Sequence, residues 1–238
     1  APDINYINGK YVLYYAMSVW GGEQTCGIGV ATANSPQGPF TDHGKMFRSN
    51  EIGVQNSIDP SLLQYEGRNY LVWGSFRGIY VIELTADGLS IMSGAKKKRI
   101  AGTAFEAVYI HKHGDYYYMF ASIGSCCQGV KSTYKVVVGR SKKVWGPYKD
   151  KTGKPMLKNG YSLVIGANDH FVGNGHGSQI IQDDAGQDWL LYHGFSRSTP
   201  ENGRILLLDQ IKWDQEGWPY VEGGSPSYET QKAPVFNN

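Results

Sequence analysis

The sequence predicts an all-β fold in which four similar units form blades of a β-propeller. Four segments repeat the pattern of an opening residue, a strand and a turn glycine, and they open at Ala1, Asp59, Glu106 and His176. The glycine follows the opening residue by eight places in the first three segments and by ten in the fourth. The openings are 47 to 70 residues apart, which is close to the length of a four-stranded blade.

Each turn glycine precedes a run rich in aromatic and β-branched residues, which predicts the second strand of each unit. These runs are 11–15, 70–73, 116–120 and 189–192. The chain also has 31 glycines and 10 prolines in 238 residues, as expected for many tight turns. Because each blade needs its neighbours to cover its faces, we expect one catalytic domain, 1–238, with blades at approximately 1–57, 58–104, 105–174 and 175–238.

The net charge and the hydropathy of the chain argue against nucleic acid and membrane as binding partners. The formal net charge of +2 is too small to argue for nucleic acid, and no apolar run approaches the roughly 20 residues of a membrane span. The basic run Lys96–Arg99 is expected to be a solvated edge strand. We therefore expect a monomer that binds neither nucleic acid nor membrane.

Three cysteines cannot form a closed disulfide framework. Cys126 and Cys127 are neighbours, so a bridge between them is expected to strain the backbone, and they lack the spacing of a metal site. We expect them to be small buried side chains.

Two carboxylates carry the predicted chemistry. In a radial arrangement of blades, the opening residues Asp59, Glu106 and His176 converge near the axis. Hydrolysis of a glycosidic bond typically needs one carboxylic acid to protonate the leaving oxygen and a second carboxylate to activate water or attack. The apolar neighbours of Glu106 should raise its pKa, as a general acid requires, and the charge of Asp59 could keep that acid protonated. The alternatives are a strand-start cap for Asp59 and an ion pair for Glu106.

Several motifs resemble those of endo-1,5-α-L-arabinanases, which are five-bladed β-propeller enzymes of glycoside hydrolase family 43. The resemblance covers nearly the whole chain, and its most specific part is the Cys-Cys-x-Gly-x-x-Ser-Thr-Tyr run, whereas Ile-Asp-Pro alone also fits the family's xylosidases and arabinofuranosidases. The matching segments are 56–60, 73–79, 105–110, 125–134 and 138–148.

The resemblance implies a role for each matching residue. Glu106 resembles the general acid of the family, and Asp59 resembles the aspartate that orients this acid and modulates its pKa. His176 resembles a histidine that helps to hold a water-rich calcium or sodium site near the axis. His193 is expected to form hydrogen bonds within the last blade.

One departure concerns the general base. In the family this is an aspartate at the opening of the first blade, a position that this sequence does not contain. Ala1 occupies the register of an opening residue, and Asp3 lies two places further on, so the base role does not transfer to Asp3. We expect either a part of a longer enzyme or a relative that only binds arabinan, and we favour the first.

Substrate contacts are expected from aromatic side chains, because sugar rings present apolar faces. We select Trp20, Phe76, Arg77 and Cys126 as substrate-binding residues. The expected activity is inverting, endo-acting hydrolysis of α-1,5-linked L-arabinofuranose in arabinan and arabino-oligosaccharides by a secreted or periplasmic enzyme. The alternatives are an exo-acting α-L-arabinofuranosidase or β-xylosidase, and a non-catalytic arabinan-binding propeller.

Overall fold

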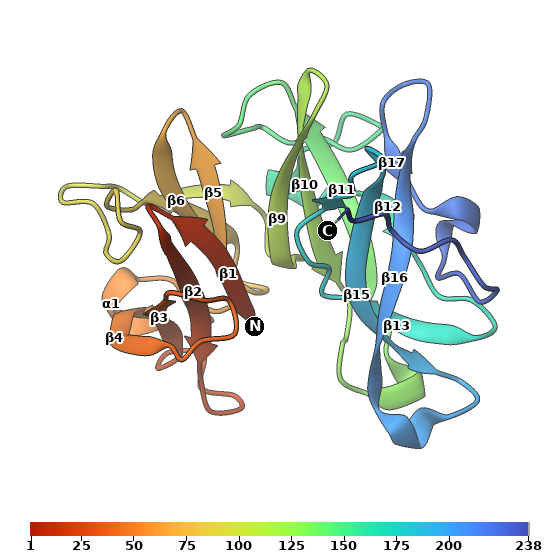
Figure 1. The fold of residues 1–238 in the computed structure, drawn as a ribbon, viewed down its shortest axis with the longest axis horizontal. Helices are drawn as coiled ribbons and strands as arrows, with labels where there is room; N and C mark the ends of the chain where they lie inside the picture. The colour runs from red at the N-terminus through yellow and green to blue at the C-terminus, as the bar shows by residue number, and fades with distance from the viewer. Residues whose placement is uncertain (238) are drawn as a thin grey trace. The chain divides into compact units, whose positions relative to one another are not determined.

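The computed structural model describes residues 1–237, and these residues form four antiparallel β-sheets (Figure 1). The helical content of the described residues is one four-residue α-helix, α1 (Ser49–Ile52), and four short 3₁₀ turns. The all-β prediction is confirmed. In three sheets the strands follow one another in the chain, which is the strand order of a propeller blade, and the fourth sheet departs from this order at one short strand.

The chain folds as two compact units. The first unit comprises Ala1–Tyr109 with Leu157–Asn159, and the second comprises Ile110–Met156 with Gly160–Asn238.

The first unit contains two four-stranded sheets. One has the order β1 (Pro2–Ile7), β2 (Lys10–Met17), β3 (Gly27–Ala33) and β4 (Thr41–Arg48). The other has the order β5 (Ser61–Tyr65), β6 (Arg68–Trp73), β7 (Ile79–Glu83) and β8 (Lys98–Ala101). The predicted turn at Asn8 and Gly9 joins β1 to β2, and both residues have positive φ, as the favoured two-residue hairpin turn requires.

The core of the first unit is built on buried aromatic residues. Trp73 and Tyr14 are fully buried, and the Trp73 ring packs against Phe47 with 5.2 Å between ring centroids. The indole of Trp73 donates a hydrogen bond to the Ser57 hydroxyl at 3.1 Å, so its polar edge is satisfied inside the core.

The last strand of the second sheet, β8, is an edge strand. Lys98 and Arg99 lie exposed on it, which confirms the edge-strand prediction for the basic run.

The second unit contains the other two sheets. Strand β9 (Glu106–His113) begins in the first unit and continues here, next to β10 (Tyr116–Ile123), β11 (Lys135–Ser141) and β12 (Ser162–Ile165). The last sheet has the order β13 (Phe171–Gly175), β15 (Asp188–Ser196), β16 (Arg204–Trp213) and β17 (Pro219–Tyr220), with β14 (Ile181–Gln182) also paired to β15. Alternate residues such as Val136, Val138 and Phe120 fill the core between these two sheets.

The first strand of the last sheet departs from the repeat seen in the sequence. It is divided into β13 and β14, and His176 follows the end of β13. His176 has a φ of 53°, which interrupts the extended backbone at this point. The segment therefore begins its strand five residues before His176, at Phe171.

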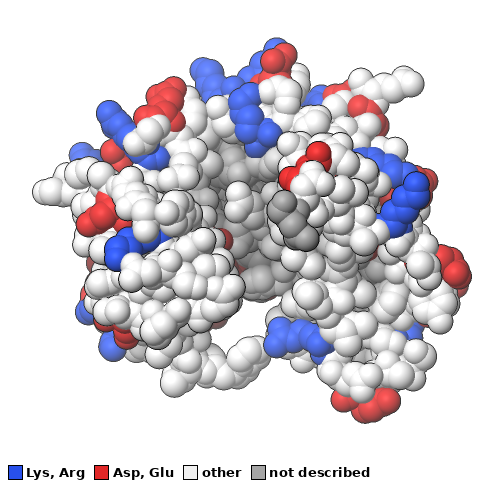
Figure 2. Space-filling model, viewed as in Figure 1, with Lys and Arg blue, Asp and Glu red and all other residues white. Residues whose placement is uncertain are grey.

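The surface drawn in Figure 2 carries lysine and arginine side chains interspersed with aspartate and glutamate side chains. Neither sign of charge dominates this face. No helix within residues 1–237 is long and apolar enough to cross a membrane.

Candidate active site

Two buried carboxyl groups lie close together in the first unit. Asp59 directly precedes Pro60 and strand β5, and Glu106 is the first residue of β9. Each residue is only 7% exposed, and a carboxylate oxygen of Asp59 lies within 4.8 Å of one of Glu106. The two acidic openings of the sequence repeat are thus neighbours.

Hydrogen bonds fix the position of Glu106. The hydroxyl of Ser75 donates to Glu106 Oε2 at 2.6 Å, and the amide of Asn56 donates to that hydroxyl oxygen at 2.9 Å. The Asn56 amide also donates to the Ser75 carbonyl at 3.1 Å. This chain of donors links the loop before β5, the loop after β6 and the start of β9, so the carboxyl group is held by three separate segments.

Asp59 is held by a bond from the segment that carries Glu106. The backbone N–H of Ala107 donates to Asp59 Oδ2 at 3.3 Å, across 48 residues of sequence. This long-range bond differs from the local strand-start cap considered as the alternative. Asp59 and Ala107 both have left-handed φ values, of 55° and 51°, a conformation that costs free energy for residues other than glycine.

Burial raises the pKa of Asp59 to about 6, against the opposing effect of the Ala107 hydrogen bond. Burial disfavours the charged form because the surrounding protein solvates a carboxylate less well than water does. When one of two neighbouring carboxyl groups is ionised, the other becomes harder to ionise. Burial and the nearby second carboxyl group therefore both favour retention of a proton by the pair, which is what a general acid needs.

The short separation of the pair limits what it can do. An inverting glycosidase needs about 6.5–9.5 Å between its acid and its base, so that a water molecule fits between them. Asp59 and Glu106 approach more closely than this. Their geometry suits an acid with a neighbouring carboxylate that modulates it, and it does not suit an acid and base pair.

Asp3 has a different role. Its two carboxylate oxygens accept hydrogen bonds from the Leu62 backbone N–H at 2.8 Å, the Asn5 amide at 2.6 Å and the Tyr109 hydroxyl at 2.9 Å. Burial raises the pKa of Asp3, against these hydrogen bonds. The carboxylate of Asp3 thus links β1, β5 and β9 within the first unit, and its exclusion from the base role stays a prediction.

His176 belongs to the second unit. Its backbone N–H donates to the Ser122 hydroxyl at 2.8 Å, and its ring stacks with His193 at 6.2 Å between centroids. The convergence of His176 with the two carboxylates stays a prediction, as does its metal-binding role.

The expectation that His193 forms hydrogen bonds within its blade is wrong. Neither of its buried ring nitrogens has a partner among the described residues. The ring stacks against Tyr134 at 5.7 Å and against His176, so aromatic faces surround it instead of donors and acceptors. Burial lowers the pKa of His193 to about 4, so its imidazole is neutral at physiological pH.

The proposed substrate-contacting residues of the first unit differ in exposure. Trp20 is 92% exposed in the loop between β2 and β3, whereas Phe76 is half-buried with a φ of 51°. The guanidinium group of Arg77 donates to both carboxylate oxygens of Glu23, at 2.9 and 2.7 Å. Their contacts with sugar remain predictions.

The expectation for Cys126 and Cys127 is wrong. A disulfide bond joins them, with Cys126 half-buried and Cys127 exposed. They lie in the loop after β10, outside the strands, where no ladder of backbone hydrogen bonds constrains the chain. Cys26 is the free, buried cysteine. The substrate-binding role assigned to Cys126 remains a prediction.

Sequence reasoning missed the residues that hold Glu106 in place. Asn56 and Ser75 were recognised only as parts of motifs. Both segments flank predicted strands near the acidic openings, which was the available signal, but the two residues are 19 positions apart and no local pattern predicts their contact.

Blade-like antiparallel sheets and a pair of buried carboxyl groups at strand openings are features that glycoside hydrolases use. The model of the glycosyl hydrolases family 43 matches residues 1–219, and the chain belongs to this family.

Relatives with known activities agree with this assignment. The chain is 38% identical to the extracellular exo-α-(1→5)-L-arabinofuranosidase of Cellvibrio japonicus, over 93% of this chain and 69% of that protein. It is 38% identical to the extracellular endo-α-(1→5)-L-arabinanase 1 of Bacillus subtilis, over 92% of this chain and 67% of that protein. Among solved structures, the Cellvibrio cellulosa α-L-arabinanase complexed with arabinohexaose matches with a TM-score of 0.85 and 35% identity, covering 94% of this chain and 77% of that one.

Proposed function

We propose that the protein hydrolyses α-1,5-linked L-arabinofuranose chains, cleaving arabinan internally and with inversion at the anomeric carbon. The observation that carries this proposal is the buried Asp59 and Glu106 pair in a member of a glycosyl hydrolase family. The endo-arabinanase of Bacillus subtilis and the arabinohexaose complex of the Cellvibrio enzyme support the choice of substrate. The names of two extracellular relatives support secretion.

In the proposed mechanism, Glu106 donates a proton to the leaving glycosidic oxygen. The Ser75 hydroxyl orients the carboxyl group through its bond to Oε2. Asp59 disfavours the ionised form of Glu106 through its own negative charge. The general base is a residue outside this pair, because the pair is too close to hold the attacking water.

The proposal includes a five-bladed propeller in which the four observed sheets are four of the blades. The likeness to the Cellvibrio arabinanase over 94% of this chain supports it. Trp20, Phe76, Arg77 and Cys126 would contact the sugar chain.

The proposal also includes a calcium or sodium ion near His176. The polar atoms of this region include imidazole nitrogens, the Ser122 hydroxyl and the unpartnered amide oxygen of Asn174. Hard cations prefer oxygen ligands, so these residues fit such an ion only if water supplies most of its coordination. A chelator should then lower activity, and added calcium should restore it. Unchanged activity after chelation would contradict this part of the proposal.

The function is tested by incubating the full enzyme with linear α-1,5-arabinan and analysing the products. Internal cleavage gives a ladder of oligosaccharides from the start, and the first product should carry the inverted anomeric configuration by NMR. Glu106→Gln should reduce the rate by about 10²–10⁴-fold, the usual contribution of general acid catalysis. The control is Glu229→Gln, which alters an exposed glutamate and should leave the rate unchanged. Full activity of Glu106→Gln would overturn the assignment.

A second candidate is exo-acting hydrolysis, which the Cellvibrio japonicus relative favours. It would release one short product from the chain end throughout the reaction. The product ladder therefore distinguishes the two candidates in the same experiment.

A further inference from the structure

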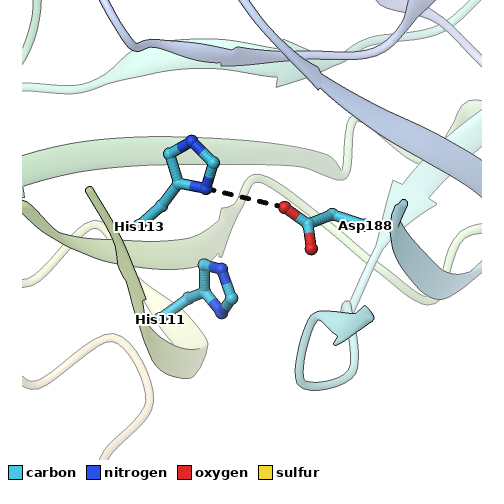
Figure 3. A group of neighbouring side chains, drawn as sticks. All are labelled: His111, His113 and Asp188. Carbon is cyan, nitrogen blue, oxygen red and sulfur yellow. Dashed lines mark ion pairs between the residues drawn. The ribbon is translucent and has the colours of Figure 1, made fainter. Parts of the chain in front are cut away.

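The far end of strand β9 carries a second group of titratable side chains. His111 and His113 are two residues apart on β9, and successive side chains of a strand point to opposite faces, so the two imidazoles lie on the same face. Asp188, the first residue of β15, lies beside them. Figure 3 shows the two rings and the carboxylate facing one another. All three residues belong to the second unit.

The potential ligand atoms are close enough for one ion to bind them. One nitrogen of each histidine and one carboxylate oxygen lie within 4.8 Å of one another, and His113 Nδ1 is 3.7 Å from Asp188 Oδ2. In a tetrahedral zinc site, bonds of about 2.0–2.2 Å place neighbouring ligand atoms about 3.3 Å apart. The pair of His113 and Asp188 is within about half an ångström of that spacing, and small side-chain rotations would bring His111 to it.

The carboxylate is already oriented by neighbouring groups. The indole N–H of Trp213 donates to Asp188 Oδ2 at 2.7 Å, and the amide of Gln182 donates to Oδ1 at 3.2 Å. A carboxylate oxygen has two lone pairs, so each oxygen can still bind a metal ion. Hydrogen bonds of this kind orient ligands in known metal sites and strengthen metal binding about 10–100-fold.

The two imidazoles are also positioned. The ring of His113 stacks on Trp213 at 3.7 Å between centroids with an interplanar angle of 7°, and His111 stacks on the same indole at 6.0 Å. Trp213 thus contacts all three of the other residues. Its ring fixes the plane of His113, and its N–H fixes the carboxylate.

The charges of the group suit a cation. Asp188 is 4% exposed, and a buried carboxylate is stabilised by a positive partner. The side chain of His113 is 38% exposed, which gives an ion access from solvent.

We propose that His111, His113 and Asp188 form a binding site for one divalent first-row transition ion, with zinc as the reference metal. Two imidazoles and one carboxylate suit such ions, whereas calcium and magnesium prefer oxygen ligands throughout. Because its ligands come from β9 and β15, the bound ion links the two sheets of the second unit. The site is distinct from the proposed calcium or sodium site at His176, and it does not depend on the proposed arabinan hydrolysis.

The test is direct metal binding by the full protein without an affinity tag, because a histidine tag would bind the same ions. Zinc should raise the melting temperature, and cobalt should produce visible absorption bands of imidazole coordination. Calcium and magnesium at the same concentration should not compete with cobalt. The cysteines are poor competitors, since Cys126 and Cys127 are bonded to each other and Cys26 is buried.

Two single variants locate the site. His111→Gln and His113→Gln should each weaken zinc binding at least about tenfold and abolish the cobalt bands. The matched control is His170→Gln, which changes an exposed histidine that stacks on Tyr228 in the same unit. The histidine variants avoid removing buried Asp188, on which Trp213 and Gln182 depend for their hydrogen bonds. The proposal is overturned if zinc binding is absent in the parent protein or survives in both variants, which would leave His113 and Asp188 as a simple ion pair.

Discussion

The two ends of strand β9 hold titratable groups in contrasting environments. At its start, Glu106 lies beside Asp59, both are buried, and their donors are neutral hydroxyl and amide groups. At its other end, His111 and His113 lie beside a single carboxylate and are partly open to solvent. The first end gathers like charges and thereby favours retention of a proton, whereas the second combines neutral donors with one anion and thereby favours a metal ion.

The contrast shows that burial acts differently on the two kinds of group. Burial raises the pKa of an acid such as Asp59 and lowers that of a base such as His111, because in both cases it disfavours the charged form. An acid that keeps its proton can serve in proton transfer. An imidazole that lacks one can serve as a ligand.

The largest predicted effect tests the acid end through the leaving group. Glu106→Gln should slow hydrolysis of linear arabinan by about 10²–10⁴-fold but should slow an aryl arabinoside with an acidic phenol much less, because that leaving group needs little protonation. The measurement is kcat/KM for both substrates. Equal losses for both would mean that Glu106 contributes binding or structure instead of a proton.

The next-largest effect tests whether ionisation of the buried Asp59 carboxyl group destabilises the folded protein. Its pKa is about 6 in the folded protein and near 3.8 when unfolded, so the folded state holds the extra proton between these values. The contribution of Asp59 to stability therefore falls as pH rises from about 4 to about 6, and the total loss is at most about 3 kcal/mol. Asp59→Asn should remove this loss while tolerating the left-handed backbone. In denaturant unfolding at pH 4 to 7, the free energy of unfolding of the variant should rise relative to that of the parent as the pH increases from about 4 to about 6. The same pH dependence of this free energy in both proteins would refute the prediction.

The same variant should change the pH dependence of catalysis. Without the charge of Asp59, the acid that protonates the leaving group ionises more readily. The alkaline limb of kcat/KM should therefore move to lower pH, by about one unit. An alkaline limb of kcat/KM at the same pH in variant and parent would show that Asp59 does not modulate the pKa of the acid.

A smaller effect tests the orientation of the carboxylate at the histidine end. Trp213→Phe keeps an aromatic surface for His113 but removes the indole N–H bonded to Asp188. Zinc affinity, measured by competition with a chromogenic chelator, should fall about tenfold. An unchanged affinity would show that Asp188 is held well enough by Gln182 alone.

The smallest effect concerns the bond between Cys126 and Cys127, which lies at neither end of β9. A bridge between adjacent residues closes almost no loop, so its reduction should lower stability by no more than about 1 kcal/mol. Mild reduction followed by thermal unfolding measures this. A large drop in melting temperature would show that the loop after β10 supports the core.

The repeated pattern of opening residue, strand and turn glycine was sufficient to predict the all-β fold and its meander sheets. Such patterns are local, because strand alternation and turn residues act within a few positions. The same register identified Asp59 and Glu106 as related positions, and the run of basic residues predicted an edge strand at Lys96–Arg99.

Only the tertiary structure decided which side chains meet. The bonds from Ser75 to Glu106 and from Ala107 to Asp59 join residues 31 and 48 places apart, and no local pattern encodes them. His111 and His113 gave a visible spacing of two, but Asp188 lies 75 residues beyond His113, and Trp213 further still. Packing also left the nitrogens of His193 among aromatic rings and joined two adjacent cysteines. These outcomes depend on how separate strands pack, which the sequence specifies only through the whole fold.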